Sequence, residues 1–215
     1  MKKFPTDKAN LLEDLIEFYS LRRDAIRIRL SEFAAVPPSR YFYELVYCLL
    51  TPQSSARHAE QVVALLDDAG FHAKRVDPER FLRRKDCYIR FHNTKSRHLL
   101  RMKDQFPAIA QKLSEPVSAM ELREWLVKNV LGLGYKEASH FLRNIGRNDG
   151  LAILDRHILR NLKRLGVIAL IPKSMSRKQY LKIEKRFSTF AVDRGIPLDE
   201  LDLVFWSMET GEIRK

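Results

Sequence analysis

The sequence predicts an all-α protein of about ten helices, because apolar residues recur at helical spacing and capping signals separate the apolar stripes. The first stripe consists of Leu11, Leu12, Leu15, Ile16 and Phe18. Only residues 151–154 and 167–171 have compositions that suit strands, and both segments are short. No repeat or low-complexity linker interrupts the helical pattern.

The helices of the first half follow from apolar stripes and from residues that end helices. A second stripe, Ile26 to Phe33, stops before Pro37, since proline suits only the first turn of a helix. The next helix is apolar on most sides, so we expect it to be central, and Gly70 ends the one after it. Asn93 or Thr94 caps a longer helix. The predicted helices cover residues 26–33, 39–50, 55–66, 78–85 and 93–106.

Capping signals define the helices of the second half. Ser118 and Glu121 form an S-x-x-E capping box. Asp155 suits an N-cap, and Gly146 and Gly166 suit helix ends. The predicted helices cover residues 118–130, 135–145, 155–166, 177–192 and 198–208.

The chain is strongly basic, with 39 Lys and Arg against 27 Asp and Glu in 215 residues and a formal net charge of +12 at pH 7. Apolar residues make up 45% of it, which excludes a disordered basic tail. The length fits one domain or two fused lobes. The charge favours a polyanionic partner, most simply nucleic acid, with an anionic membrane surface or bare solubility as alternatives.

Several classes of protein are excluded by composition. Cys48 and Cys87 are the only cysteines, too few for an all-cysteine zinc site, a cysteine-ligated iron–sulfur cluster or a multi-disulfide scaffold, and they suit a reducing intracellular setting. No apolar segment follows the first residues, so we expect no signal peptide, and no stretch approaches the roughly 20 apolar residues that span a bilayer. We therefore expect no membrane association.

The most informative segment is a glycine hairpin between two predicted helices. A dinucleotide-binding loop is disfavoured, because no strand precedes Gly132 and Gly134 and the third glycine is missing. Glycines in such a turn let backbone N–H groups approach an anion, and the following helix start adds positive dipole. The hairpin therefore predicts a clamp for a DNA phosphate, with an ordinary turn between helices as the alternative.

Two residues after the hairpin have the chemistry of a catalytic pair. Lys136 lies in the first helical turn, where the helix dipole disfavours a cation and favours a neutral amine that can attack. Asp155 at an N-cap stays ionised and could assist the amine or stabilise a sugar cation. A solvated lysine and a simple helix cap are the alternatives for each residue taken alone.

These residues occur in motifs that resemble a known family. Residues 132–144, residues 154–160 and the tail from Asp202 to Lys215 are similar to the archaeal-type 8-oxoguanine DNA glycosylase/AP lyase branch of the helix–hairpin–helix DNA glycosylase superfamily. The resemblance covers most of the chain. It implies a two-lobed all-α fold with the active site in the cleft between the lobes. It also implies no external cofactor, since this branch lacks the iron–sulfur cluster of some relatives.

The resemblance implies a mechanism and a partner. The substrate would be double-stranded DNA that contains 8-oxoguanine or an abasic site, bound without an obligatory protein partner. Lys136 would displace the flipped-out base through a Schiff base, and β-elimination would then nick the strand, with Asp155 assisting. We expect a cytoplasmic, nucleoid-associated enzyme. A glycosylase for another damaged base and a non-catalytic DNA-binding module are the alternatives.

Other positions gain roles from the same resemblance. Gln53 would fill the gap left in the duplex, and His157 would contact a phosphate. Phe91, Trp206 and Lys215 would recognise the base. Gln53 could instead belong to a simple turn, and His157 could be an exposed helix residue. Trp206 could be a core aromatic, and Lys215 could lie in a frayed terminus. Main-chain carbonyls could hold a monovalent cation; they belong to Lys128, Val130 and Leu133.

The expected lobes divide the chain unevenly. Residues 33–153 would form a central helical lobe that includes the hairpin. Residues 1–32 and 154–215 would form the second lobe.

Overall fold

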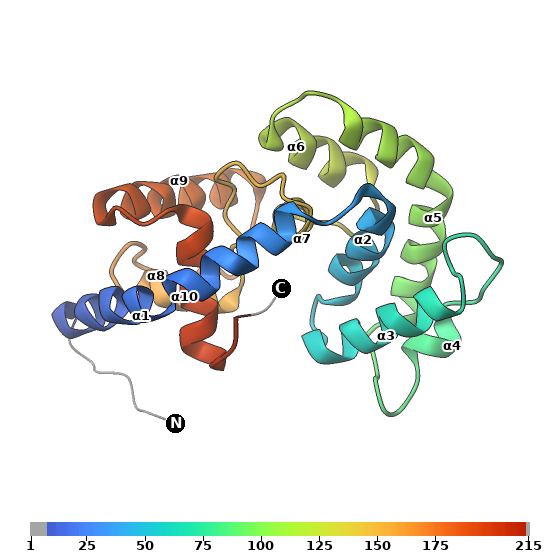
Figure 1. Cartoon of the computed structure of the whole chain (residues 1–215), viewed down its shortest axis with the longest axis horizontal. Coiled ribbons are helices and arrows are strands. Elements are labelled where there is room, and N and C mark those ends of the chain that lie inside the picture. Colours follow the sequence, from blue (N-terminus) through green and yellow to red (C-terminus); the bar gives the residue numbers. More distant parts are fainter. Residues whose placement is uncertain (1–7, 214–215) are drawn as a thin grey trace. The chain divides into compact units, whose positions relative to one another are not determined.

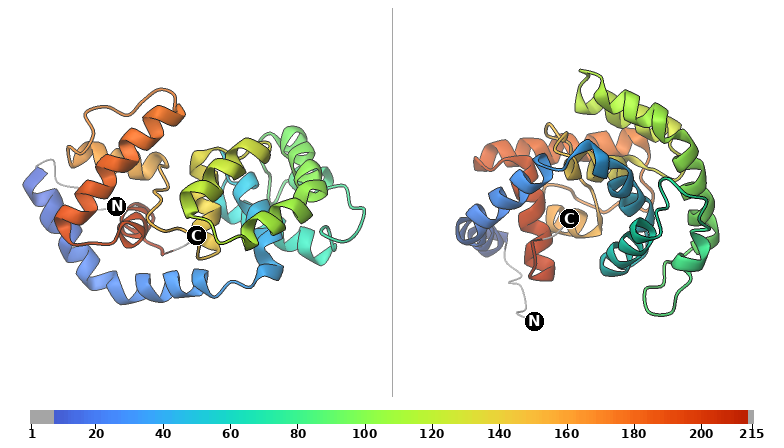
Figure 2. Two further views of the ribbon diagram at one scale, coloured as in Figure 1. Left: turned by 90° about the horizontal axis from the view of Figure 1, so that it is seen from above. Right: turned by 45° about the vertical axis from the view of Figure 1, so that its right-hand side comes forward.

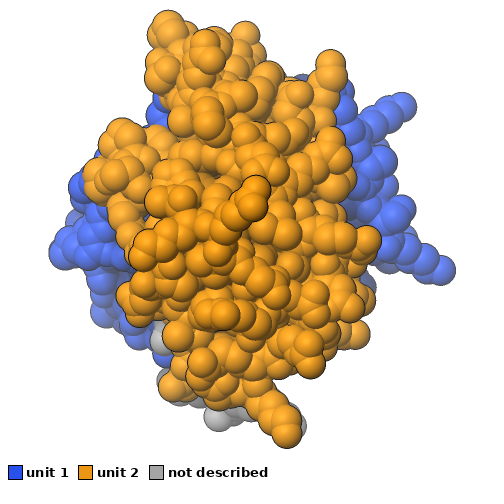
Figure 3. Space-filling model, turned by 90° about the vertical axis from the view of Figure 1, so that its right-hand side faces the viewer, with its two compact units in different colours: residues 1–35, 146–215 blue, residues 36–145 orange. Residues whose placement is uncertain are grey.

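Every regular element of the described chain is a helix, which confirms the predicted fold class. The computed structural model describes residues 8–213, and these contain ten α-helices, one 3-10 turn and no strand (Figure 1). The chain divides into two units: unit 1 comprises residues 1–35 and 146–215, and unit 2 comprises residues 36–145 (Figure 3). Unit 2 runs from residue 36 to residue 145, whereas we predicted a central lobe of residues 33–153.

The described part of unit 1 contains four helices, of which the last lies against the other three. Their bounds are α1 (Lys8–Ala34), α8 (Arg156–Arg164), α9 (Arg177–Arg194) and α10 (Leu198–Thr210). The two N-terminal stripes belong to the single helix α1, since neither glycine nor proline interrupts them (Figure 2). Buried Glu200 ties α10 to α1 by accepting hydrogen bonds from Tyr19 Oη at 2.7 Å and Arg27 Nε at 3.0 Å.

The segment 151–154, predicted as a possible strand, is instead an irregular loop fixed by side chains of α9. The Tyr180 hydroxyl donates to the Ala152 carbonyl at 2.6 Å and accepts from the Leu154 N–H at 3.3 Å. Glu184 accepts from the Ala152 N–H at 2.9 Å. These side chains satisfy backbone groups that a strand would pair in a sheet. Residues 167–171 are irregular as well, so both strand predictions were wrong.

Unit 2 is built around a central buried helix. Its elements are η1 (Pro38–Arg40), α2 (Tyr41–Leu50), α3 (Ala56–Asp68), α4 (Glu79–Leu82), α5 (His92–Ser114), α6 (Ala119–Asn129) and α7 (Tyr135–Asn144). Every residue from Phe42 to Leu50 is buried, and α2 packs against α3, α5 and α7 (Figure 1). The expectation of a central helix over 39–50 is confirmed.

Two helices of unit 2 differ in length from their predictions. Helix α5 continues past Phe106 and contains Pro107, because the buried Ile109 and Leu113 extend its apolar stripe. Their burial offsets a proline cost of about 3 kcal/mol. Helix α4 is a single turn, shorter than the predicted helix over 78–85. The chain folds back after it, and the Leu82 carbonyl accepts a hydrogen bond from the Ile89 N–H at 2.9 Å.

The predicted caps at Ser118 and Asp155 are confirmed. The predicted cap at Asn93 or Thr94 is wrong, because α5 begins at His92 and its N-cap is Phe91. Ser118 and Glu121 exchange the reciprocal bonds of a capping box at the start of α6. Cys48 and Cys87 are both buried, and neither forms a disulfide. Within residues 8–213, none of the helices has the length and apolar content needed to cross a bilayer.

Candidate active site

The hairpin joins α6 to α7 as a tight turn closed by one backbone bond. The Leu133 N–H donates to the Val130 carbonyl at 3.2 Å, and both side chains are buried. Gly132 has φ +88, a left-handed conformation that glycine adopts without a steric penalty. The first intrahelical bond of α7 runs from the Ala138 N–H to the Gly134 carbonyl. The N–H groups of residues 135–137 therefore remain at the open start of the helix, where an anion can bind.

The back of the hairpin lies against α5. A Cβ atom on Gly132 would come within 2.2 Å of His98 Nδ1, so only glycine fits over this ring. Burial, with the nearby positive charge of Arg97, lowers the pKa of His98 below its ordinary value of 6.5, so the ring is neutral at pH 7. The ring of His98 therefore packs under the hairpin as an uncharged support.

The three residues expected to offer carbonyl oxygens to a cation line one hollow of about 390 Å³ at the hairpin. Oxygen donors of this kind suit a hard cation. The Val130 carbonyl already accepts one hydrogen bond, and Arg101 lines the same hollow with a positive side chain. The described residues contain no cluster of three or more His, Cys, Asp or Glu that could hold a metal. The cation at these carbonyls stays a prediction.

Lys136 occupies the second position of α7, as predicted, and its side chain is only 25% exposed. Its Nζ lies 3.6 Å from Oε1 of Glu137, whose side chain is 17% exposed. The Glu137 carboxylate also folds back over Gly134, because a Cβ there would meet Glu137 Oε2 at 2.9 Å. A carboxylate at this helix start is favoured by the dipole and balances the lysine charge.

Gln53 and Phe91 lie on two turns of unit 2 and share an unusual backbone. Gln53 has φ +55 and Phe91 has φ +60, and they are two of the three non-glycine residues with positive φ among residues 8–213. Both side chains are exposed, Phe91 by 52%. Left-handed non-glycine residues are strained, and such strain concentrates at functional sites. The two predicted DNA-contacting side chains are thus presented to solvent from strained turns.

Lys95 connects these two turns, and the sequence analysis missed it. Its Nζ donates to the carbonyls of Leu50 and Pro52, each at 2.6 Å, and to Ser54 Oγ at 3.1 Å. Burial lowers the pKa of Lys95 from 10.5 to about 8, and the charge of Lys136 also lowers it, while Glu137 opposes the shift. Its position on the apolar stripe of Leu99, Met102 and Phe106 is the signal that could have found it.

Asp155 caps α8 as predicted, and it belongs to unit 1, whereas Lys136 belongs to unit 2. A single oxygen, Oδ1, accepts both cap bonds, from the N–H of His157 at 2.7 Å and of Ile158 at 2.8 Å. Capping therefore uses only Oδ1. The other carboxylate oxygen has no part in the cap.

The remaining predicted residues have different surroundings within unit 1. His157 is 18% exposed, and its Nδ1 lies 3.8 Å from Oε2 of Glu209 on α10. Glu209 also pairs with Arg164 at 2.7 Å. Trp206 is half-buried between the fully buried Phe205 and Ser207, so it is not an ordinary core residue. Lys215 lies outside the described residues.

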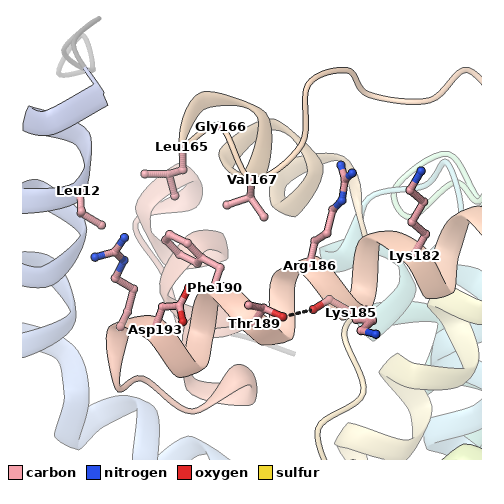
Figure 4. A pocket seen from close by; sticks show the side chains of 11 residues that line it. Leu12, Leu165, Gly166, Val167, Lys182, Lys185, Arg186, Thr189, Phe190 and Asp193 are labelled. Carbon is pink, nitrogen blue, oxygen red and sulfur yellow. Dashed lines mark hydrogen bonds between the residues drawn. The ribbon is translucent and has the colours of Figure 1, made fainter.

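Unit 1 also contains a pocket of about 540 Å³ between α1, the end of α8, and α9. Leu12, Val167 and Phe190 line it, together with cationic residues of α9 (Figure 4). None of the predicted site residues lines this pocket.

A glycine hairpin that leads directly into the open start of a lysine-bearing helix is the arrangement of the helix–hairpin–helix DNA glycosylases, and fold and site point to this class. The family model described as 8-oxoguanine DNA glycosylase matches residues 26–196. The chain belongs to this 8-oxoguanine DNA glycosylase family.

Relatives and solved structures agree with this membership. The 8-oxoguanine DNA glycosylase/AP lyase of Fusobacterium nucleatum is 41% identical over 179 residues, which cover 80% of this chain and 81% of the relative. The crystal structure of the 8-oxoguanine DNA glycosylase of Thermotoga maritima matches with a TM-score of 0.85 at 28% identity, covering 97% of this chain and all of that one.

A third match is a protein–DNA complex. The Methanocaldococcus jannaschii 8-oxoguanine glycosylase/lyase, solved with a 15mer DNA containing 8-oxoguanine, has a TM-score of 0.80 at 31% identity. The alignment covers 94% of this chain and 99% of that chain.

Proposed function

We propose that this protein excises 8-oxoguanine from duplex DNA and then nicks the strand at the resulting abasic site. The observation that carries the proposal is the position of Lys136, a largely buried amine in the first turn of the helix that follows the glycine hairpin. The membership of the chain in a family of 8-oxoguanine glycosylases supports the choice of substrate. Since the substrate is DNA, we expect the protein to act in the nucleoid.

The hairpin binds the DNA backbone without regard to sequence. The N–H groups at the start of α7 and the glycine-lined turn accept one phosphate, and the helix dipole adds to the attraction. The damaged nucleotide then leaves the stack, because its sugar carbon is out of reach inside a duplex. Gln53, exposed on its turn, fills the space left behind, and His157 contacts a phosphate.

Lys136 carries out the covalent chemistry. The deprotonated form of its amine attacks C1′ of the flipped nucleotide and forms a C–N bond, while the bond to the base breaks and the base leaves with the electron pair and takes up a proton. Ring opening gives a protonated Schiff base. Loss of a C2′ proton then expels the 3′ phosphate by β-elimination. The charge of Asp155 stabilises the positive sugar in the first step.

Phe91 and Trp206 contact the flipped base by stacking, which suits an unstacked purine. Phe91 is exposed and Trp206 is half-buried, so both rings have surface to offer. Lys215 adds a charged group to base recognition.

A panel of lesion duplexes tests the proposal. We expect the protein to release 8-oxoguanine faster than an oxidised pyrimidine or an alkylpurine from otherwise identical duplexes. Preferential excision of another base would contradict the substrate. Binding without any base release would instead indicate a non-catalytic DNA-binding module.

A further inference from the structure

Lys95 directs all three ammonium protons at the segment that ends α2 and carries Gln53. Its acceptors are the carbonyls of Leu50 and Pro52 and the hydroxyl of Ser54, and the side chain is nearly fully buried. Buried lysines are ordinarily paired with carboxylates, because burying a charge is costly. Here the three bonded partners are neutral, so stability alone does not explain the lysine.

The bond to the Pro52 carbonyl fixes the conformation of the turn. Residues 51–54 form a turn closed by the Ser54 N–H on the Thr51 carbonyl at 3.0 Å. Proline at its second position and left-handed Gln53 at its third give the type II pattern, which ordinarily has glycine at the third position. Type I and type II turns differ by a flip of the central peptide, here Pro52–Gln53. A donor on the Pro52 carbonyl therefore decides between them.

Without that donor the turn would relax. A flip of the peptide to type I would bring Gln53 to a φ of about −90° and remove its strain. The flip would also re-aim the Gln53 side chain. The strained form thus persists because Lys95 holds the carbonyl, in keeping with strain that surrounding structure imposes at functional sites.

We propose that Lys95 is a positioning residue that holds Gln53 in its left-handed conformation and so aims this side chain at the DNA. The inference rests on the proposed role of Gln53 in filling the gap of the duplex. A further bond anchors the same turn to the segment that leads into α5, because the Arg90 N–H donates to Ser54 Oγ at 3.0 Å. The Lys95 N–H makes the first helical bond of α5, to the Phe91 carbonyl at 2.9 Å.

The test is a double-mutant cycle on kcat/KM for excision of 8-oxoguanine from duplex DNA. Lys95→Met should lower kcat/KM by a factor of roughly 5 to 30, the population change that corresponds to the cost of a left-handed residue. In a Gln53→Ala background the same change should cost less than about twofold, because the positioned side chain is already gone. Equal losses in the two backgrounds would overturn the inference.

Matched controls separate this outcome from others. Lys103→Met makes the same change on the same helix, where the lysine contacts the Lys74 carbonyl and not the Gln53 turn, and should retain wild-type kcat/KM. Wild-type protein that releases no 8-oxoguanine would contradict the proposed function itself. If thermal unfolding shows Lys95→Met to be unfolded, Ser54→Ala replaces it. With Gln53 present, Ser54→Ala should lower kcat/KM by less than Lys95→Met is expected to. In the Gln53→Ala background it should not lower kcat/KM, and a loss in both backgrounds would overturn the inference.

Discussion

The cap made by Asp155 uses one carboxylate oxygen, which separates its structural role from the chemical role that we propose for its charge. Oδ1 accepts the two N–H bonds that cap α8, so the cap needs one oxygen acceptor and no negative charge. Asparagine caps helices about as well as aspartate. Substitution can therefore remove the charge and keep the helix.

Asp155→Asn should leave the thermal stability near that of the wild type and reduce the excision rate by roughly 100-fold, the effect of losing one electrostatic contact to the transition state. Asp155→Ala should cost a further ~1 kcal/mol of stability, since it also removes the cap. Single-turnover excision and thermal unfolding measure the two effects separately. If Asp155→Asn excised the base at the wild-type rate, Asp155 would act only as a helix cap.

Lys95 makes stability depend on pH in a direction opposite to that of a salt-bridged lysine. Its pKa is about 8 in the folded protein, against 10.5 for an ordinary lysine. Between these values the unfolded chain binds the extra proton, so the free energy of unfolding rises with pH. Below pH 8 both states are protonated, and the cost of burying the charge is fully present.

We therefore expect wild-type protein to gain up to about 2 kcal/mol of unfolding free energy relative to Lys95→Met between about pH 7 and about pH 9.5. Denaturant unfolding of the two proteins in parallel measures this difference and cancels the titration of other groups. A difference that is constant or that shrinks over this range would show that the buried lysine does not titrate there.

The hairpin is the element that we propose to bind DNA, and its shape requires glycine at position 132 for two separate reasons. The left-handed φ disfavours any other residue, and the ring of His98 occupies the space of a Cβ atom. Gly150 offers a comparison, because it has φ +76 and open space around the missing Cβ.

Gly150→Ala should cost about 1–2 kcal/mol of unfolding free energy from backbone strain alone. Gly132→Ala should cost more, because the added methyl also displaces His98, and it should weaken binding to damaged and undamaged duplexes alike. Denaturant unfolding and fluorescence anisotropy measure these quantities. If the two variants lost the same free energy of unfolding, the clash with His98 would add nothing to the cost of Gly132→Ala.

Elements set by local signals could be predicted from the sequence, and those set by distant contacts could not. The Ser118 capping box and the Asp155 cap depend on residues within one turn, and both predictions were correct. The prediction of a strand over residues 151–154 was wrong, because side chains of Tyr180 and Glu184 on α9 form hydrogen bonds with its backbone groups.

The same limit applies to the site. Lys136 was placed correctly at the start of its helix by the hairpin next to it. Lys95 was missed, since its acceptors lie more than 40 residues earlier in the chain. The strain at Gln53 likewise became visible only with the backbone angles of the folded chain.

For the whole molecule, the net charge of +12 and the family membership answer different questions. Charge supplies sequence-independent affinity for DNA and its salt dependence, but it carries no preference for a damaged base. Family membership supports the choice of substrate. The proposed chemistry depends on the covalent bond that Lys136 forms with the sugar.

Borohydride trapping on a duplex that contains 8-oxoguanine tests that bond directly, because reduction of a Schiff base links protein and DNA permanently. We expect wild-type protein and the matched control Lys103→Gln to give a covalent adduct, and Lys136→Gln to give none. The absence of an adduct with wild-type protein, or an adduct of normal yield with Lys136→Gln, would contradict the account.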